Sequence, residues 1–127
     1  MIESAFPILE VGDMDAALAF YRDALGGTML YRFPPDGEGD PVYVSLALGS
    51  SSIGIGVAES PLPPGNLLLW FYVDDVDRVT SALAAAGATV LEPPSDEVWG
   101  ERTSLVTDPW GTRIHLGAAI SPPPDEE

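Results

Sequence analysis

Apolar residues recur every three or four positions in two segments of the chain, and this spacing predicts two amphipathic helices. The first follows Val11-Gly12-Asp13, with Asp13 as its N-cap, and ends at Gly26-Gly27. The second follows Val73-Asp74-Asp75, again with an aspartate cap, and ends at Gly87. The apolar positions are Met14, Ala17, Leu18, Tyr21 and Leu25 in the first helix, and Val76, Val79, Leu83 and Ala86 in the second.

Shorter apolar runs, separated by segments rich in Pro, Gly, Ser and Asp, predict one strand before each helix and three strands after it. The predicted strands cover residues 5–11, 28–33, 42–48 and 52–57 in the first half, and 67–73, 89–92, 102–107 and 112–116 in the second. The breaker Asp108-Pro109-Trp110-Gly111 is typical of a type I turn. The end of the chain, residues 119–127, is predicted to be a disordered, acidic, Pro-rich tail.

The order of predicted elements occurs twice. Placing Val11-Gly12-Asp13 on Val73-Asp74-Asp75 gives an offset of 62 residues and pairs helix with helix and strand with strand. We therefore expect a single domain over residues 1–118, built from a module at about 4–58 and a second at about 66–118. Each helix covers one face of its sheet, so the remaining faces must pack on something or enclose a cavity.

Segments in both halves of the chain carry a resemblance to a known family. They are Pro7–Asp13, Ala19-Phe20-Tyr21 and Leu25-Gly26 in the first half, and Val73–Val76, Ala86–Ala88 and Thr107–Ile114 in the second. With them the sequence resembles the glyoxalase/bleomycin-resistance/extradiol dioxygenase superfamily, or vicinal oxygen chelate fold, over residues 4 to 118. The resemblance implies an α+β fold in which two βαβββ modules form a cup-shaped, partly open mixed sheet with the helices on its outer face. It also implies a homodimer.

Metal-dependent members of that superfamily place four ligands on the concave strands. Residue by residue, the resemblance puts these positions at Phe6, Gly54 (or Gly56 with a small gap), Leu68 and His115. Three of the four offer no donor atom, and typical metal sites use three or four protein ligands. We therefore expect no metal and no other cofactor, which argues against a glyoxalase, an extradiol dioxygenase or a thiol transferase.

Side-chain alternation along the strands selects the residues that line the expected cup. If Leu68 faces inward, then Trp70 and Tyr72 do so too, whereas Leu69 and Phe71 face the helix. The predicted ligand-binding residues are Phe6, Ile8, Glu10, Tyr43, Ser45, Leu68, Trp70, Tyr72, Trp99, Arg102, Arg113 and His115, and none is assigned as catalytic.

Structural interpretations of the same residues stay open. The aromatic residues can fill the cup or a dimer contact, and His115 can be a ring satisfied by a neighbouring backbone group. Glu10 can pair with Arg113 instead of with a cationic ligand. Similar Trp-Gly-x-Arg segments border the pocket in related proteins, which places Trp99 near it by resemblance.

The amino-acid composition limits the classes of binding partner that we expect. The 127 residues hold 20 Asp and Glu against five Arg and no Lys, for a net charge of −15. Such a charge repels phosphates, so we expect neither nucleic acid nor a membrane surface as a partner, although it can also serve solubility alone. The absence of cysteine excludes disulfides and thiolate chemistry. No targeting segment or membrane span is recognised, which predicts a cytoplasmic protein.

An apolar, aromatic-lined cup with few catalytic groups suits binding better than chemistry. We therefore predict a small-molecule binding protein that confers antibiotic resistance. It would sequester an aromatic drug, either neutral or cationic, of the bleomycin, mitomycin or quinone/enediyne type without changing it. The alternative is a metal-independent isomerase or cyclase that uses His115 or Glu10 as acid or base. A third interpretation is a regulatory or interaction domain with an empty cup.

Overall fold

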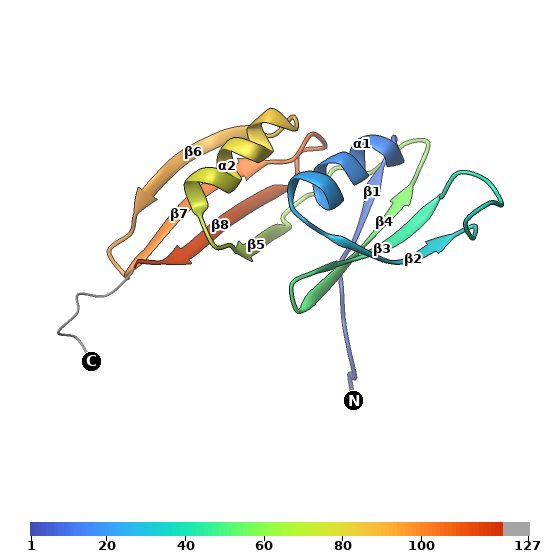
Figure 1. Cartoon of the computed structure of the whole chain (residues 1–127), viewed down its shortest axis with the longest axis horizontal. Coiled ribbons are helices and arrows are strands. Elements are labelled where there is room, and N and C mark those ends of the chain that lie inside the picture. The colour runs from blue at the N-terminus through green and yellow to red at the C-terminus, as the bar shows by residue number, and fades with distance from the viewer. Residues whose placement is uncertain (121–127) are drawn as a thin grey trace. The chain divides into compact units, whose positions relative to one another are not determined.

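The computed structural model describes residues 1–120, and the chain divides into two compact units between Pro64 and Gly65. Both units have the order predicted from the repeat, one strand, one helix and three strands (Figure 1). The first contains β1 (Ile8–Val11), α1 (Met14–Leu18) with its continuation η1 (Ala19–Ala24), β2 (Thr28–Phe33), β3 (Tyr43–Leu48) and β4 (Ser51–Val57). The second contains β5 (Leu68–Tyr72), α2 (Val76–Ala85), β6 (Thr89–Asp96), β7 (Glu101–Thr107) and β8 (Arg113–Ala119).

Each unit is a four-stranded mixed sheet with the same topology. The strand orders are β1-β4-β3-β2 and β5-β8-β7-β6. In both sheets the first and last strands of the unit pair in parallel, and the remaining pairs are antiparallel. The helix lies on one face of its own sheet and leaves the other face open (Figure 1). The predicted α+β class and βαβββ modules are confirmed.

Aspartate caps start both helices, as the sequence predicts. The Asp13 carboxylate accepts a hydrogen bond from the Ala16 amide at 3.2 Å, and the Asp75 carboxylate accepts one from the Arg78 amide at 3.0 Å. The first helix continues as a π-helical turn, η1, which buries both Phe20 and Tyr21.

Strand alternation builds the two cores. In the first unit Leu9 and Val11 of β1 are buried together with Val44 and Leu46 of β3. In the second unit α2 packs against β6, β7 and β8, and side-chain alternation buries one face of the sheet. The buried apolar residues of this unit are Leu69, Val76, Leu83, Val106, Ile114 and Leu116. Phe71 shares this face but is only half-buried, so it contributes less to the core than the sequence suggests.

Three strand boundaries differ from the predicted ones by three residues or more. β1 begins at Ile8 rather than at residue 5, so Phe6 precedes the strand. The pair Pro93-Pro94 does not end β6, which runs to Asp96. β6 is an edge strand, and both prolines lie in the register shift between Glu92 and Ser95, where the pairing with β7 is interrupted. β8 extends to Ala119, the first residue of the predicted tail, and Ile120 donates its amide to the Gly100 carbonyl at 3.0 Å. The rest of that tail, 121–127, lies outside the described residues. No helix within residues 1–120 is long and apolar enough to span a membrane.

Candidate functional site

The open face of the second sheet brings together most of the predicted site residues of that unit. Trp70 of β5 pairs in register with His115 of β8, and Leu68 pairs with Arg113. Tyr72 pairs with Gly117, where no side chain intervenes. Trp70 is 39% exposed, whereas its neighbour Leu69 on the helix side is 8% exposed. The alternation predicted for β5 is therefore correct.

The centre of this face is a stack of two rings. The centroids of Trp70 and His115 lie 4.8 Å apart with the planes tilted by 32°, and the Tyr72 ring lies 6.0 Å from Trp70. The indole of Trp70 also covers Gly117: a Cβ at that position would lie 3.2 Å from its Cζ2 and Nε1 atoms. Gly117 thus leaves the room in which the indole lies against the sheet.

A backbone contact determines which nitrogen of His115 is available to a ligand. Nδ1 lies 3.1 Å from the Ser104 carbonyl oxygen, which can only accept a hydrogen bond. In the neutral ring the proton therefore resides on Nδ1, and Nε2 carries the lone pair. The predicted satisfaction of His115 by a neighbouring backbone group is observed, and it leaves Nε2 as an acceptor or base.

Sequence reasoning missed Glu101. Trp99, in the turn between β6 and β7, donates its indole N–H to Glu101 Oε1 at 2.7 Å. Glu101 pairs with Ala119, so it shares the open face with Thr103 and Leu105. The pKa of the Tyr72 phenol is raised above its ordinary value, chiefly by a hydrogen bond with the Glu101 carboxylate. Alternation back from the buried Val106 and Ser104 was the signal that could have identified Glu101.

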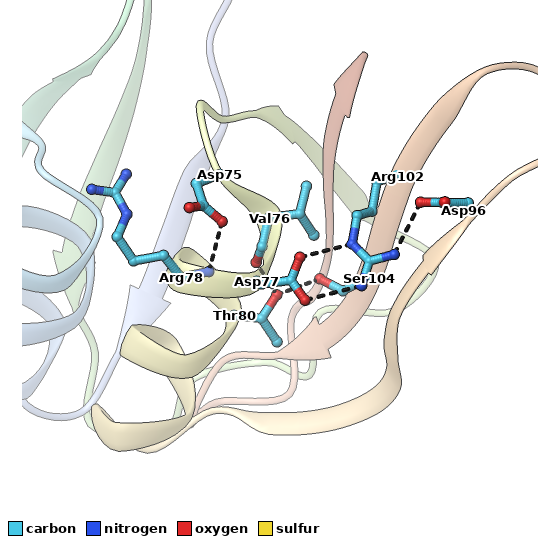
Figure 2. Close-up of polar contacts among 8 residues, drawn as sticks. All are labelled: Asp75, Val76, Asp77, Arg78, Thr80, Asp96, Arg102 and Ser104. Carbon is cyan, nitrogen blue, oxygen red and sulfur yellow. Dashed lines mark hydrogen bonds and ion pairs between the residues drawn. The ribbon is translucent and has the colours of Figure 1, made fainter. Parts of the chain in front are cut away.

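The same alternation places Arg102 on the helix side, away from the ring stack, which corrects its assignment to the ligand face. Arg102 holds Asp77 of α2 through two bonds, Nε to Oδ2 at 2.7 Å and Nη2 to Oδ1 at 3.0 Å (Figure 2). Its Nη1 also bonds Asp96 Oδ1 at 2.9 Å. The hydrogen bond from Arg102 lowers the pKa of Asp77. Beside this network, a 2.8 Å hydroxyl contact joins Thr80 of α2 to Ser104 of β7 (Figure 2).

The first sheet has an open face of its own. Ile8 and Ser45 flank Gly54 of β4 in register, and Glu10 and Tyr43 flank Gly56. A Cβ at Gly54 would lie 3.0 Å from Cε1 and Cζ of Tyr43, so this glycine also lies beneath an aromatic ring. Phe6, which precedes β1, is 49% exposed. The predicted residues of β1 and β3 thus share one face, as expected from alternation.

Glu10 has a local partner. Its Oε1 atom accepts a hydrogen bond from the Leu62 amide at 3.2 Å, which ties the segment after β4 to β1. The two partners predicted for this carboxylate were Arg113 and a cationic ligand. The structure adds a third, a backbone amide within the same unit.

The residues present do not fit a divalent metal. The side chains of Phe6, Gly54 and Leu68, which stand at three of the four ligand positions implied by the resemblance, contain no donor atom. Within residues 1–120 no three His, Asp or Glu side chains lie close enough together to hold one ion. His115 is therefore considered for its hydrogen bonding and basicity alone.

The sequence profile of the Glyoxalase/Bleomycin resistance protein/Dioxygenase superfamily matches residues 6–116. The chain belongs to this superfamily. Superfamily members bind small-molecule ligands and commonly dimerise. The family resemblance found in the sequence is confirmed, and so is the fold class that it implied.

Two relatives and one solved structure are similar to the chain. The uncharacterized protein Mb0911c of Mycobacterium bovis is 29% identical over 126 residues, covering 90% of this chain and 82% of the relative. The putative glyoxylase CFP32 of Mycobacterium bovis is 32% identical over 114 residues, covering 88% of this chain but only 41% of CFP32. A glyoxalase/bleomycin resistance protein/dioxygenase family enzyme from Burkholderia phytofirmans superposes with a TM-score of 0.73 at 23% identity. That match covers 89% of this chain and 95% of the other, and it supports the fold alone.

Proposed function

We propose that this superfamily member binds an aromatic small molecule on the open face of the β5–β8 sheet and sequesters it without chemical change, as a drug-resistance protein. The observation that carries the proposal is the accessible stack of Trp70 on His115, with ring centroids 4.8 Å apart. A planar ligand can extend this stack, because Trp70 is 39% exposed on a face that the helix does not cover.

The energetics favour binding by pre-positioned rings. Each well-oriented aromatic pair contributes about 0.5–1.5 kcal/mol beyond area burial. Trp70 is held by Gly117 beneath it and by His115 beside it, so little side-chain entropy remains to be lost when a ligand binds. The ligand positions without donor atoms support a role that needs no metal.

The polar groups and the charge of the protein indicate which kind of ligand the open face can bind. Nε2 of His115 accepts a hydrogen bond, which suits a phenol, amide or amine proton on a planar compound. The net charge of −15 attracts a cationic compound rather than an anionic one. Drugs of the bleomycin, mitomycin and quinone/enediyne types are the candidate ligands to test. The proposal includes a homodimer in the cytoplasm as the working form, and the dimerisation of other superfamily members supports the first part.

A titration of aromatic antibiotics followed by tryptophan fluorescence tests the proposal. Trp70→Ala is expected to weaken binding by about 1–3 kcal/mol, because it removes the ring on which the ligand stacks. Trp110→Ala is the matched control, since Trp110 lies in the turn between β7 and β8. Mass analysis of the compound after incubation must return its original mass. Equal loss of affinity in the two variants, or an altered compound, contradicts sequestration at Trp70.

A second candidate, a metal-independent isomerase or cyclase, is favoured by one observation. Because Nδ1 of His115 is engaged by the Ser104 carbonyl, Nε2 is free to take a proton from a bound substrate. The measurement that separates the two functions is turnover of a bound compound by the wild type and by His115→Gln. Turnover that disappears in the variant while affinity is retained makes His115 a general base and replaces the sequestration proposal.

A further inference from the structure

Glu101 lies between two exposed aromatic residues at one end of the open face. Trp99, 60% exposed, donates its indole N–H to Oε1 of Glu101 at 2.7 Å. Tyr72, 69% exposed, follows Trp70 on the same face of β5 at a ring distance of 6.0 Å. The Glu101 carboxylate also raises the pKa of the Tyr72 phenol. Two exposed rings therefore adjoin one half-buried carboxylate, and one of them, Trp99, is hydrogen-bonded to it.

The negative charge of Glu101 has no cationic partner among residues 1–120. The adjacent Arg102 points to the opposite face, where Asp77 and Asp96 occupy its guanidinium. Glu97, in the same turn, accepts a hydrogen bond from the Thr103 hydroxyl at 2.9 Å and brings no positive charge. A half-buried carboxylate that is bonded only to neutral donors retains lone pairs and charge for a cation.

We propose that Glu101, Trp99 and Tyr72 form a binding site for an organic ammonium group, so that the ligand of the open face is an aromatic amine. This inference rests on the proposed function, because it names the charged part of the same ligand. The carboxylate supplies a charge-assisted hydrogen bond, and the rings of Trp99 and Tyr72 supply π faces to the same cation. The indole–carboxylate bond holds one ring in place before the ligand arrives.

The chemistry separates an ammonium group from other cations. A bare metal ion needs several oxygen ligands, and Glu101 is a single carboxylate. An alkylammonium group needs one acceptor and gains from apolar, electron-rich surfaces, which is the combination found here. A neutral aromatic compound can use Trp70 and His115 but gains nothing from Glu101.

The probe is 2-phenylethylamine, a cation at neutral pH, and its reference is the neutral analogue 2-phenylethanol of nearly the same shape. Binding is followed by nuclear magnetic resonance on the indole N–H signals. The amine is expected to bind the wild type about tenfold more tightly than the alcohol. In Glu101→Gln this preference is expected to disappear, while the glutamine oxygen can still accept the Trp99 N–H.

Glu59→Gln is the charge control. Glu59 is an exposed acid after β4, outside the β5–β8 sheet, so its variant changes the net charge by the same amount as Glu101→Gln but leaves the open face of that sheet intact. It is expected to keep the preference for the amine. If Glu101→Gln does not fold, Trp99→Leu at an exposed position is used instead and is expected to reduce the preference.

Each outcome has one meaning. Equal affinity of amine and alcohol in the wild type overturns the ammonium site and leaves aromatic binding standing. A preference that survives Glu101→Gln, or that Glu59→Gln removes equally, also overturns it. Failure of both probes to bind contradicts the aromatic face itself and therefore the proposed function.

Discussion

Replacing Gly117 by alanine places one methyl group beneath the indole of Trp70. A Cβ at this position would lie 3.2 Å from Cζ2 and Nε1 of Trp70 and 3.4 Å from Cε2. Gly117 does not have a positive φ, so alanine can adopt its backbone conformation without strain. The substitution therefore acts on the position of the indole.

The expected cost in stability is small. Ordinary van der Waals contact begins at 3.4 Å, so the indole has to move outward by a few tenths of an ångström. Overpacking costs about 1–3 kcal/mol in a closed core, and a ring that is 39% exposed belongs at the low end. Replacing glycine also lowers the entropy of the unfolded chain, which stabilises the folded state by about 0.4–1 kcal/mol. The free energy of unfolding is expected to stay within about 1 kcal/mol of the wild type.

Ligand affinity is expected to respond more strongly than stability. The displaced indole no longer meets His115 at the native distance of 4.8 Å and tilt of 32°, so a planar ligand cannot contact both rings as well. We expect the affinity for an aromatic ligand to fall by about three- to tenfold. Urea unfolding and a fluorescence titration measure the two quantities on the same samples.

Gly12→Ala is the matched control, because a Cβ there meets nothing within 4 Å and the backbone φ is not positive. It is expected to change neither quantity appreciably. The reasoning is refuted if Gly117→Ala shifts the Trp70 indole signal while the affinity is unchanged, because the ligand then does not stack on Trp70. A destabilisation of several kcal/mol would show that the indole cannot move.

Three further predictions concern polar contacts. Asp75→Ala removes the cap of α2 and is expected to lower the free energy of unfolding by about 0.5–2 kcal/mol in urea titrations. Because Arg102 lowers the pKa of Asp77 from 3.8, their pair stabilises the fold above pH 3.8 and ceases to do so as the pH falls through the lowered value. The melting temperatures of wild type and Arg102→Met should therefore converge in acid, and a constant difference contradicts this account. In Glu101→Gln the pKa of Tyr72 is expected to return toward 10.0 in a spectroscopic titration.

Local sequence rules predicted most of the fold because the decisive interactions are local. The cap of each helix joins residues three positions apart, and the alternation of Leu9 and Val11, or of Val44 and Leu46, follows from strand geometry. The extent of β6 could not be predicted in this way. Pro93-Pro94 ends a central strand but is tolerated at an edge, and only the sheet order shows which strand lies at the edge.

In the site, too, the features set by local sequence could be predicted, and those set by tertiary contacts could not. Trp70 and Tyr72 were placed on the open face by alternation from Leu68, the ligand position that the resemblance implied, and the burial of Leu69 on the helix side agrees with this. Arg102 was assigned from a Trp-Gly-x-Arg segment rather than from alternation, and this put it on the wrong face. The ion pair of Arg102 with Asp77 joins residues 25 positions apart, which no local pattern reveals, whereas Asp96 is the cross-strand partner of Arg102 in the β6–β7 hairpin.

Because Glu101 and not Arg102 lies on the open face, the charges on that face differ from those predicted from the sequence. This face carries Arg113, in register with Leu68, near one end and Glu101, in register with Ala119, at the other, with Glu92 of β6 beside Leu105. The six residue-to-residue steps from position 113 to position 119 of β8 span about 20 Å at the usual rise of a strand. The Trp70–His115 stack lies between these two ends. A ligand that places an ammonium group at Glu101 therefore extends its aromatic part over Trp70 and directs any acidic or hydrogen-bond-accepting end toward Arg113. Such an orientation requires an elongated molecule, and it explains why a compact neutral ring would use only the centre of the face.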